Sequence, residues 1–156
     1  MTASVTPTVR NAAKAVIIRD GQVLLQRAVW AGQECYFLPG GGQHPGEALD
    51  NTVRREVLEE TGLTVAVERM LWLREYIGAH HGGAPDDHRV EVVFLCRPEG
   101  DPEQLGGHAE DDAQTGLEWV DLERIPGSNL LPLGLRSLIA GLAHSEPPTR
   151  YLGDIA

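Results

Sequence analysis

Residues 41–63 read GGQHPGEALDNTVRREVLEETGL, a glycine-rich segment followed by the clearest helix signal in the chain. Three aliphatic residues recur at four-residue intervals (Leu49, Val53 and Val57), which predicts the apolar face of a helix. This helix is expected to cover residues 48–61. Gly62 then stands where a glycine commonly ends a helix. The stretch therefore predicts a loop and a helix that stops at this glycine.

Three glutamates near the end of the expected helix occupy unfavourable positions. Glu56, Glu59 and Glu60 stand at i, i+3 and i+4, so they share one side of the helix, beside its apolar face. The helix dipole disfavours each anion there by roughly 0.3–1 kcal/mol, and Glu56 and Glu60 form a like-charge pair one turn apart. A divalent cation resolves these conflicts, and carboxylate oxygens suit Mg²⁺ or Mn²⁺. A solvated acidic helix face is the alternative.

The spacing of the whole stretch is more specific than the helix alone. After Gly41, five residues precede Glu47, seven more precede Arg55, and the run REVLEETGL follows. This pattern resembles the Nudix box, GX5EX7REUXEEXGU with U an aliphatic residue, and every fixed position is filled. The flanking segments 37–41 and 117–122 also resemble those of Nudix proteins, so the resemblance spans most of the chain.

The resemblance implies a fold, a reaction and a cofactor. The fold is α/β, an α/β/α sandwich around a mixed, partly barrel-like sheet. The reaction is hydrolysis of a phosphoanhydride bond in a nucleoside diphosphate linked to another group, with Mg²⁺ or Mn²⁺ as cofactor. Glu56 and Glu60 are expected to bind the metal, and Glu59 to bind it or to act as the base that activates water. The backbone carbonyl of Gly40 is expected to be a further ligand.

The other box residues are expected to support these ligands. Arg55 would orient a glutamate through a charge-assisted hydrogen bond, for which a guanidinium is well shaped. Glu47 would hold the loop against the helix. Gly41 would serve the turn more than the chemistry, and Gly62 would end the helix.

Outside the box, the candidates for substrate binding are weaker. Arg27 could meet a phosphate or lie at the surface, and Trp30 could stack on a nucleobase or pack in the core. Glu91, in an otherwise apolar strand, could face the substrate or form a buried ion pair. An acidic loop could add a further carboxylate to the site or could simply be solvated. Its acidic residues are Glu110, Asp111 and Asp112.

The rest of the chain predicts strands around two helices in one domain, residues 1–156. Asp20-Gly21 is a hairpin signal between strands at 13–19 and 23–25. Further strands are expected at 36–38, 64–77, 89–96 and 117–120, and a second helix at 133–144. Residues 30–35 and 98–115 are expected to be loops. Residues 78–88 are also expected to form a loop. For its histidines, the first expectation is that they are simply solvated, and the second is a role in substrate specificity. Residues 1–11 are expected to form a loose arm and 145–156 a tail able to dock.

Composition restricts the partners. The formal net charge of −10 disfavours binding to a nucleic-acid polymer, so an anionic substrate needs a local source of positive charge such as a metal. No apolar run is long enough to span a membrane, and no secretory signal is seen. Two cysteines without CxxC spacing suggest a reducing compartment, hence a cytoplasmic location. Nudix proteins are often homodimers, which makes a homodimer possible here.

The substrate remains open at this level. Nudix proteins that hydrolyse ADP-ribose tend to carry a proline shortly after the box, and residues 78–80 contain none. Those that act on dinucleoside polyphosphates tend to carry a tyrosine nearby, and Tyr76 lies a few residues early. No coenzyme A signature precedes the box. A nucleoside triphosphate or related nucleotide is the default, with ADP-ribose, nucleoside diphosphate sugars or dinucleoside polyphosphates as alternatives. A non-catalytic nucleotide sensor is disfavoured by the intact box.

Overall fold

The computed structural model describes residues 6–106 and 114–156, which form a mixed α/β fold around an eight-stranded sheet. The order along the sheet is β3-β2-β1-β6-β5-β8, with β4 paired to β1 and β7 paired to β2. The pairs β1–β6 and β5–β8 are parallel, and the others are antiparallel. The strands are β1 (Val9–Arg19), β2 (Gln22–Trp30), β3 (Gln33–Phe37), β4 (Gly40–Gly42), β5 (Thr64–Ile77), β6 (His88–Glu99), β7 (Gln114–Asp121) and β8 (Arg150–Asp154).

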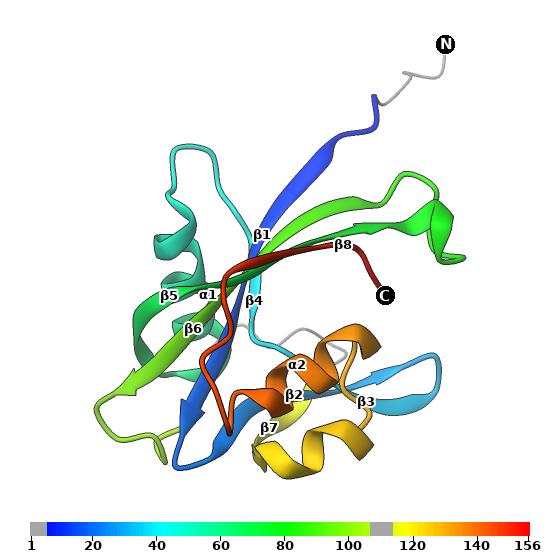
Figure 1. The fold of residues 1–156 in the computed structure, drawn as a ribbon. Coiled ribbons are helices and arrows are strands. Elements are labelled where there is room, and N and C mark those ends of the chain that lie inside the picture. The colour runs from blue at the N-terminus through cyan, green and yellow to red at the C-terminus, as the bar shows by residue number, and fades with distance from the viewer. Residues whose placement is uncertain (1–5, 107–113) are drawn as a thin grey trace.

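Helices cover the sheet from two sides, as Figure 1 shows. Helix α1 (Leu49–Thr61) lies on one side, and α2 (Arg136–Gly141) lies on the other with two 3₁₀ helices, η2 (Leu122–Gly127) and η3 (Leu133–Leu135). A third 3₁₀ turn, η1 (Gly78–His80), follows β5. Two hydrophobic cores result, one under α1 and one under η2, η3 and α2.

Strand β1 connects the two cores because its side chains alternate between the faces of the sheet. Ala15 and Ile17 pack in the core that contains Val53 of α1. Val16, between them, packs in the core that contains Ile139 of α2. The strand expected at 13–19 is therefore buried on both sides, as a central strand should be.

Helix α1 and strand β5 follow the predicted boundaries closely, but residues 30–35 are not a loop. Strand β2 continues to Trp30, and a turn at Ala31 and Gly32 leads directly into β3. Both turn residues have positive φ (51° and 76°), as they do at the predicted hairpin turn of Asp20 and Gly21 (45° and 74°). The second turn was missed because alanine rarely adopts this conformation.

The termini and the second helix also differ from the prediction. Val9 begins β1 and pairs with His88 of β6, so the expected loose arm does not extend to residue 11. The tail contains β8, which lies along β5. The helix expected at 133–144 is a 3₁₀ turn followed by a short α2, because Gly134 and Gly141 lower the helix propensity. The loop expected at 98–115 is shorter, since β6 runs to Glu99.

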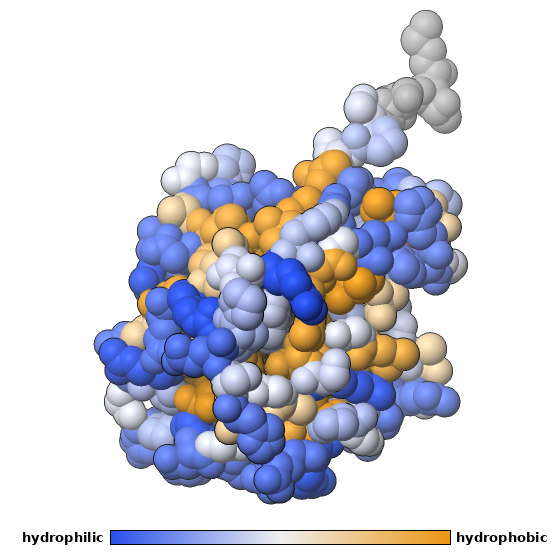
Figure 2. Space-filling model, in the orientation of Figure 1, coloured by the Kyte–Doolittle hydropathy of each residue, from blue (hydrophilic) through white to orange (hydrophobic). Residues whose placement is uncertain are grey.

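The surface is mainly hydrophilic at the rim of the face seen in Figure 2, and apolar residues gather toward its centre. None of the helices among the described residues has the length and apolar character that a membrane crossing requires. The homodimer stays a prediction.

Candidate functional site

The C-terminal half of α1 presents its glutamates to the glycine strand β4. Val53 and Val57 are fully buried and fix α1 on the sheet. The helix ends at Gly62, which has a left-handed conformation (φ 75°) and donates its backbone N–H to the Leu58 carbonyl at 3.0 Å. Glu60 lies next to β4, while the side chain of Glu59 is 45% exposed. Of the predicted acidic face, Glu56 and Glu60 therefore lie against β4, whereas Glu59 is half-exposed.

Glu60 is the most enclosed of these carboxylates. Its Oε2 accepts the backbone N–H of Gly40 at 2.9 Å and the Gln26 side-chain amide at 2.6 Å. Burial raises the pKa of Glu60, and the charge of Glu56 raises it further, whereas the Gly40 N–H and the Lys14 ammonium lower it. An additional cation beside Glu60 would stabilise the ionised form of this carboxyl.

The glycines of β4 allow the backbone to lie against these glutamates. A Cβ atom on Gly41 would lie 2.7 Å from both carboxylate oxygens of Glu56. A Cβ on Gly40, where φ is 141°, would collide with the Ala13 carbonyl and with Lys14. The need for glycine at position 41 therefore comes from the approach of Glu56, not from a turn as expected.

Arg55 ties the loop before α1 to the glutamates. Its Nε donates to Glu47 Oε2 at 2.8 Å, and Nη2 donates to Glu47 Oε1 at 3.1 Å and to the Gly42 carbonyl at 2.9 Å. Its Nη1 donates to Glu56 Oε1 at 2.9 Å and to Glu59 Oε2 at 3.4 Å. Arg55 lowers the pKa of the Glu47 carboxyl to about 2. The guanidinium thus holds the loop and two helix glutamates in one network.

The donor atoms at this site are all hard oxygens. Carboxylates of Glu56, Glu59 and Glu60 lie within two turns of one helix. The Gly40 backbone of β4 donates its N–H to Glu60, and its carbonyl accepts a hydrogen bond from Lys14 at 3.3 Å. Among residues 6–106 and 114–156, no three acidic, histidine or cysteine side chains are already arranged as a metal site. The chemistry of the donors fits Mg²⁺ or Mn²⁺.

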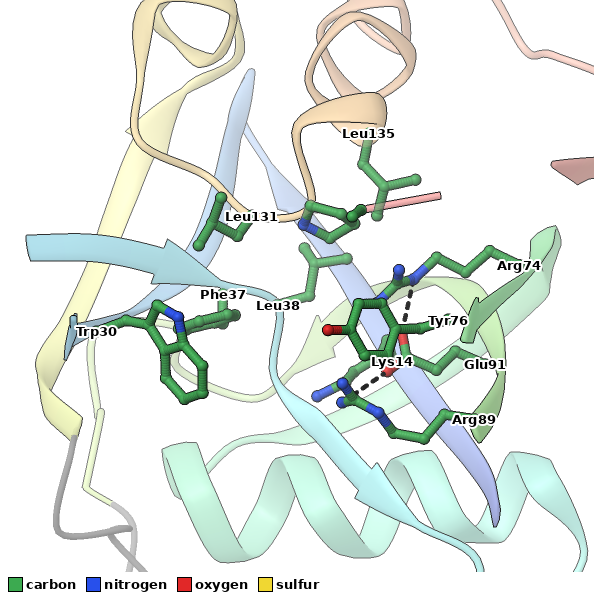
Figure 3. Close-up of a pocket in the computed structure, with 12 residues that line it drawn as sticks. Lys14, Trp30, Phe37, Leu38, Arg74, Tyr76, Arg89, Glu91, Leu131 and Leu135 are labelled. Carbon is green, nitrogen blue, oxygen red and sulfur yellow. Dashed lines mark hydrogen bonds and ion pairs between the residues drawn. The ribbon is translucent and has the colours of Figure 1, made fainter. Parts of the chain in front are cut away.

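A cavity of about 290 Å³ is lined by Lys14, whose ammonium group donates to the Gly40 carbonyl at 3.3 Å. Figure 3 shows aromatic rings from Trp30 and Phe37 on one side of it, and a group of charged residues on the other. In that group, the Arg89 guanidinium stacks on the Tyr76 ring, 4.7 Å from its centre. The cavity therefore combines aromatic and cationic surfaces, which suit a planar ring attached to phosphates.

Glu91 forms a buried ion pair at the edge of this cavity. Glu91 is 2% exposed, and its Oε2 accepts from Arg74 Nε at 2.7 Å and pairs with Nη2 at 2.7 Å. The remaining Arg74 nitrogen, Nη1, donates to the Ile155 carbonyl at 2.7 Å. The second oxygen of Glu91 lies 3.6 Å from Arg89 Nη1. The structure shows the ion-pair alternative for Glu91, and the paired residues also line the cavity.

The positions of Trp30 and Arg27 each agree with one of the two alternatives given for them. Trp30 is 65% exposed and lines the cavity, outside the core. Gln26, not Arg27, reaches Glu60. Neighbouring strand residues face opposite sides, and Arg27 instead lies 3.7 Å from Glu118. The alternation of β2 could have revealed this, because Gln26 follows buried Leu24 on the α1 face. Glu110, Asp111 and Asp112 lie outside the described residues.

The loop histidines hold the C-terminal strand. His80 Nδ1 and His81 Nε2 each lie 2.8 Å from an oxygen of Asp154 in β8. Asp154 also accepts the backbone N–H of Ile77 at 3.0 Å. Burial raises the pKa of Asp154, but these partners outweigh it and lower the pKa to about 2. The loop thereby attaches β8 to the end of β5.

Comparison with known proteins identifies the family. A family model described as the NUDIX domain matches residues 8–140. The chain belongs to the Nudix family. The intact box at residues 41–63 and the β4–α1 geometry are thus the Nudix motif in its folded form.

Nudix relatives with curated names differ in their substrates. The chain is 32% identical over 114 residues to an ADP-ribose pyrophosphatase of Methanocaldococcus jannaschii, covering 71% of this chain and 61% of that protein. It is 30% identical over 118 residues to an oxidized purine nucleoside triphosphate hydrolase of Danio rerio, covering 74% and 68%. The crystal structure of a MutT NUDIX hydrolase from Burkholderia pseudomallei matches with a TM-score of 0.61 and 30% identity, covering 88% and 99%.

Proposed function

We propose that this protein is a Mg²⁺- or Mn²⁺-dependent Nudix pyrophosphohydrolase that cleaves a phosphoanhydride bond in a nucleoside diphosphate linked to another group. The observation that carries this proposal is the approach of the Glu56 and Glu60 carboxylates to the backbone of β4. The names of the relatives, a pyrophosphatase and a triphosphate hydrolase, support the same reaction class.

In this proposal, Glu56, Glu60 and the Gly40 carbonyl would hold the metal. When bound, such a cation neutralises phosphate oxygens and lowers the pKa of a bound water. Arg55 keeps Glu56 and Glu59 oriented, and its pairing with Glu47 keeps the loop in place. The cationic charge also lets an acidic protein accept an anionic substrate.

Glu59 is the proposed base that takes the proton from the attacking water. Its side chain is more exposed than that of Glu56, 45% against 16%, and its contact with Arg55 is longer, 3.4 Å against 2.9 Å. A carboxylate with this freedom can reach a water at the mouth of the site, whereas Glu56 and Glu60 are held against β4. If Glu59 instead serves only as a ligand, its loss will weaken metal binding.

The cavity is the proposed place for the nucleoside or for the group linked to it. Its aromatic residues offer faces for a planar ring, and its basic residues offer positive charge near the phosphates. This supports a nucleotide substrate, with a nucleoside triphosphate as the default and ADP-ribose, sugar nucleotides or dinucleoside polyphosphates as alternatives. The likeness to an ADP-ribose pyrophosphatase supports including that substrate first in the assays.

A hydrolysis panel tests the proposal. Nucleoside triphosphates, 8-oxo-dGTP, ADP-ribose, NADH, UDP-sugars, dinucleoside polyphosphates and coenzyme A are each incubated with protein and Mg²⁺, and products are separated by ion exchange. Turnover should require the metal, stop with EDTA, and return with excess Mg²⁺ or Mn²⁺. Glu56→Gln and Glu59→Gln should abolish turnover. Glu68→Gln is the control and should keep turnover, because Glu68 is an exposed residue of β5 that pairs with Arg97 of β6. Binding of a nucleotide without turnover by the native protein would instead indicate a sensor.

A further inference from the structure

We propose that Lys14 binds a phosphate of the substrate at the junction between the cavity and the Nudix glutamates. This inference rests on the proposed function, because it assumes a nucleotide that extends from the cavity to α1. It goes further by assigning the contact to one side chain that lies outside the box.

The position of Lys14 joins the two parts of the site. Its aliphatic chain lies over Gly40, so that a Cβ on that glycine would be 2.9 Å from Lys14 Cδ. Its Nζ donates to the Gly40 carbonyl at 3.3 Å, and its charge lowers the pKa of Glu60. The same side chain lines the cavity together with Glu91 and Arg89, as Figure 3 shows. A phosphate next to Gly40 therefore meets the ammonium group.

Two of the other cations at the site, Arg55 and Arg74, are already engaged. Arg55 donates to Glu47, Glu56 and Glu59 and to the Gly42 carbonyl. Arg74 uses its nitrogens on Glu91 and on the Ile155 carbonyl. By contrast, the hydrogen bond of Lys14 within the described residues goes to a neutral carbonyl. An ammonium has three donors, so Lys14 retains donors for a phosphate oxygen.

The amino-acid type at this position is also informative. Lys14 is the only lysine in the sequence, whereas the other twelve basic residues are arginines. The chain therefore uses the compact ammonium group at one place, where the side chain must pass over the backbone of Gly40. A point charge on an unbranched chain fits this space, whereas a planar guanidinium is wider.

The single lysine allows a direct binding test. Reductive methylation with ¹³C-formaldehyde gives one dimethyl-lysine NMR signal and keeps the positive charge; its absence in Lys14→Arg separates it from any α-amino signal. In the Glu59→Gln background, which prevents turnover, the signal is recorded with Mg²⁺ alone, with Mg²⁺ and ATP, with Mg²⁺ and ADP-ribose, and with adenosine. We expect it to shift with a bound phosphate-bearing nucleotide beyond any shift from Mg²⁺ alone, and not with adenosine.

Kinetics of charge-removing variants give a second test. Lys14→Met should raise KM about 10- to 100-fold, the loss expected for one charge-assisted hydrogen bond, with a smaller effect on kcat. Lys14→Arg should restore part of the KM. Arg10→Met is the matched control, because Arg10 lies on the same strand but is exposed and pairs with Asp87; its KM should match the native value. A role of Lys14 in folding alone would instead lower the melting temperature and leave KM unchanged.

The outcomes separate the two proposals. If the native protein turns over a nucleotide but the Lys14 signal does not move and KM is unchanged in Lys14→Met, this inference is wrong and the proposed function stands. If no nucleotide of the hydrolysis panel is bound or hydrolysed, the proposed function fails, and the inference fails with it.

Discussion

Replacing Gly41 with alanine should displace Glu56 without removing any functional group. The Cβ of the new residue would lie 2.5 Å from Glu56 Cδ and 2.7 Å from both carboxylate oxygens, and ordinary contact begins at 3.4 Å. The carboxylate must therefore retreat by about 0.9 Å if the backbone stays fixed. Gly41 does not have a positive φ, so alanine is compatible with the backbone itself.

This displacement should affect catalysis far more than stability. A shift of about 1 Å in a catalytic group can cost about 100-fold in rate, so we expect kcat to fall about 10- to 100-fold. The atoms that must move are at the end of a flexible side chain. The loss in free energy of unfolding should therefore be about 1 kcal/mol or less, which corresponds to about 2–4 °C in melting temperature for a chain of this size.

The assay is steady-state hydrolysis of the best substrate at saturating Mg²⁺, with thermal unfolding measured in parallel. Gly42→Ala is a matched control, because a Cβ at that position meets nothing within 4 Å. Its kcat should equal that of the native protein. If Gly41→Ala keeps native kcat while Glu56→Gln is inactive, then the position of Glu56 against β4 is not what the chemistry requires, and the reasoning is refuted.

Three further predictions concern stability and reactivity. Replacing Glu91 with leucine leaves Arg74 buried without its carboxylate and should cost about 3–5 kcal/mol in urea unfolding; the double variant with Arg74→Met should recover much of this, and additive losses would contradict the ion pair. Glu47 and Asp154 have pKa values lowered to about 2, so the stability they supply is present above about pH 4 and lost as the pH falls toward 2. The midpoint of urea unfolding should therefore decline between pH 6 and pH 2. Asp154→Asn should make this decline shallower. Burial raises the pKa of the Cys96 thiol to about 12, so it should react slowly with a disulfide reagent at pH 8 until the protein unfolds, and fast reaction in the native state would argue against its burial.

Local patterns in the sequence predicted α1 well because helix periodicity depends on neighbours in the chain. The helix begins at Leu49 and ends at Thr61, within one residue of the expectation, and its glutamates lie on the predicted face. The hairpin at Asp20 and Gly21 was equally local. The turn at Ala31 was missed because its conformation is forced by the pairing of β2 with β3, and alanine carries no signal for it.

Contacts between distant segments could not be predicted in this way. Gln26 reaches Glu60 because β2 passes under the end of α1. Arg74 bonds to the Ile155 carbonyl, 81 residues away, because β8 adds to the edge of the sheet beside β5. Such contacts depend on strand order, which a single sequence does not encode in any local pattern.

Spacing and periodicity are properties of consecutive residues, so the family and the helix could be predicted from the sequence, together with the grouping of three glutamates on one side of that helix. Tertiary structure alone decided which residues surround those acids. Lys14 lies over Gly40, and Glu91 pairs with Arg74, because sheet pairing brings separate strands together. The need for glycine at position 41 likewise follows from the packing of Glu56 against β4, a steric fact that appears only when the helix and the strand meet.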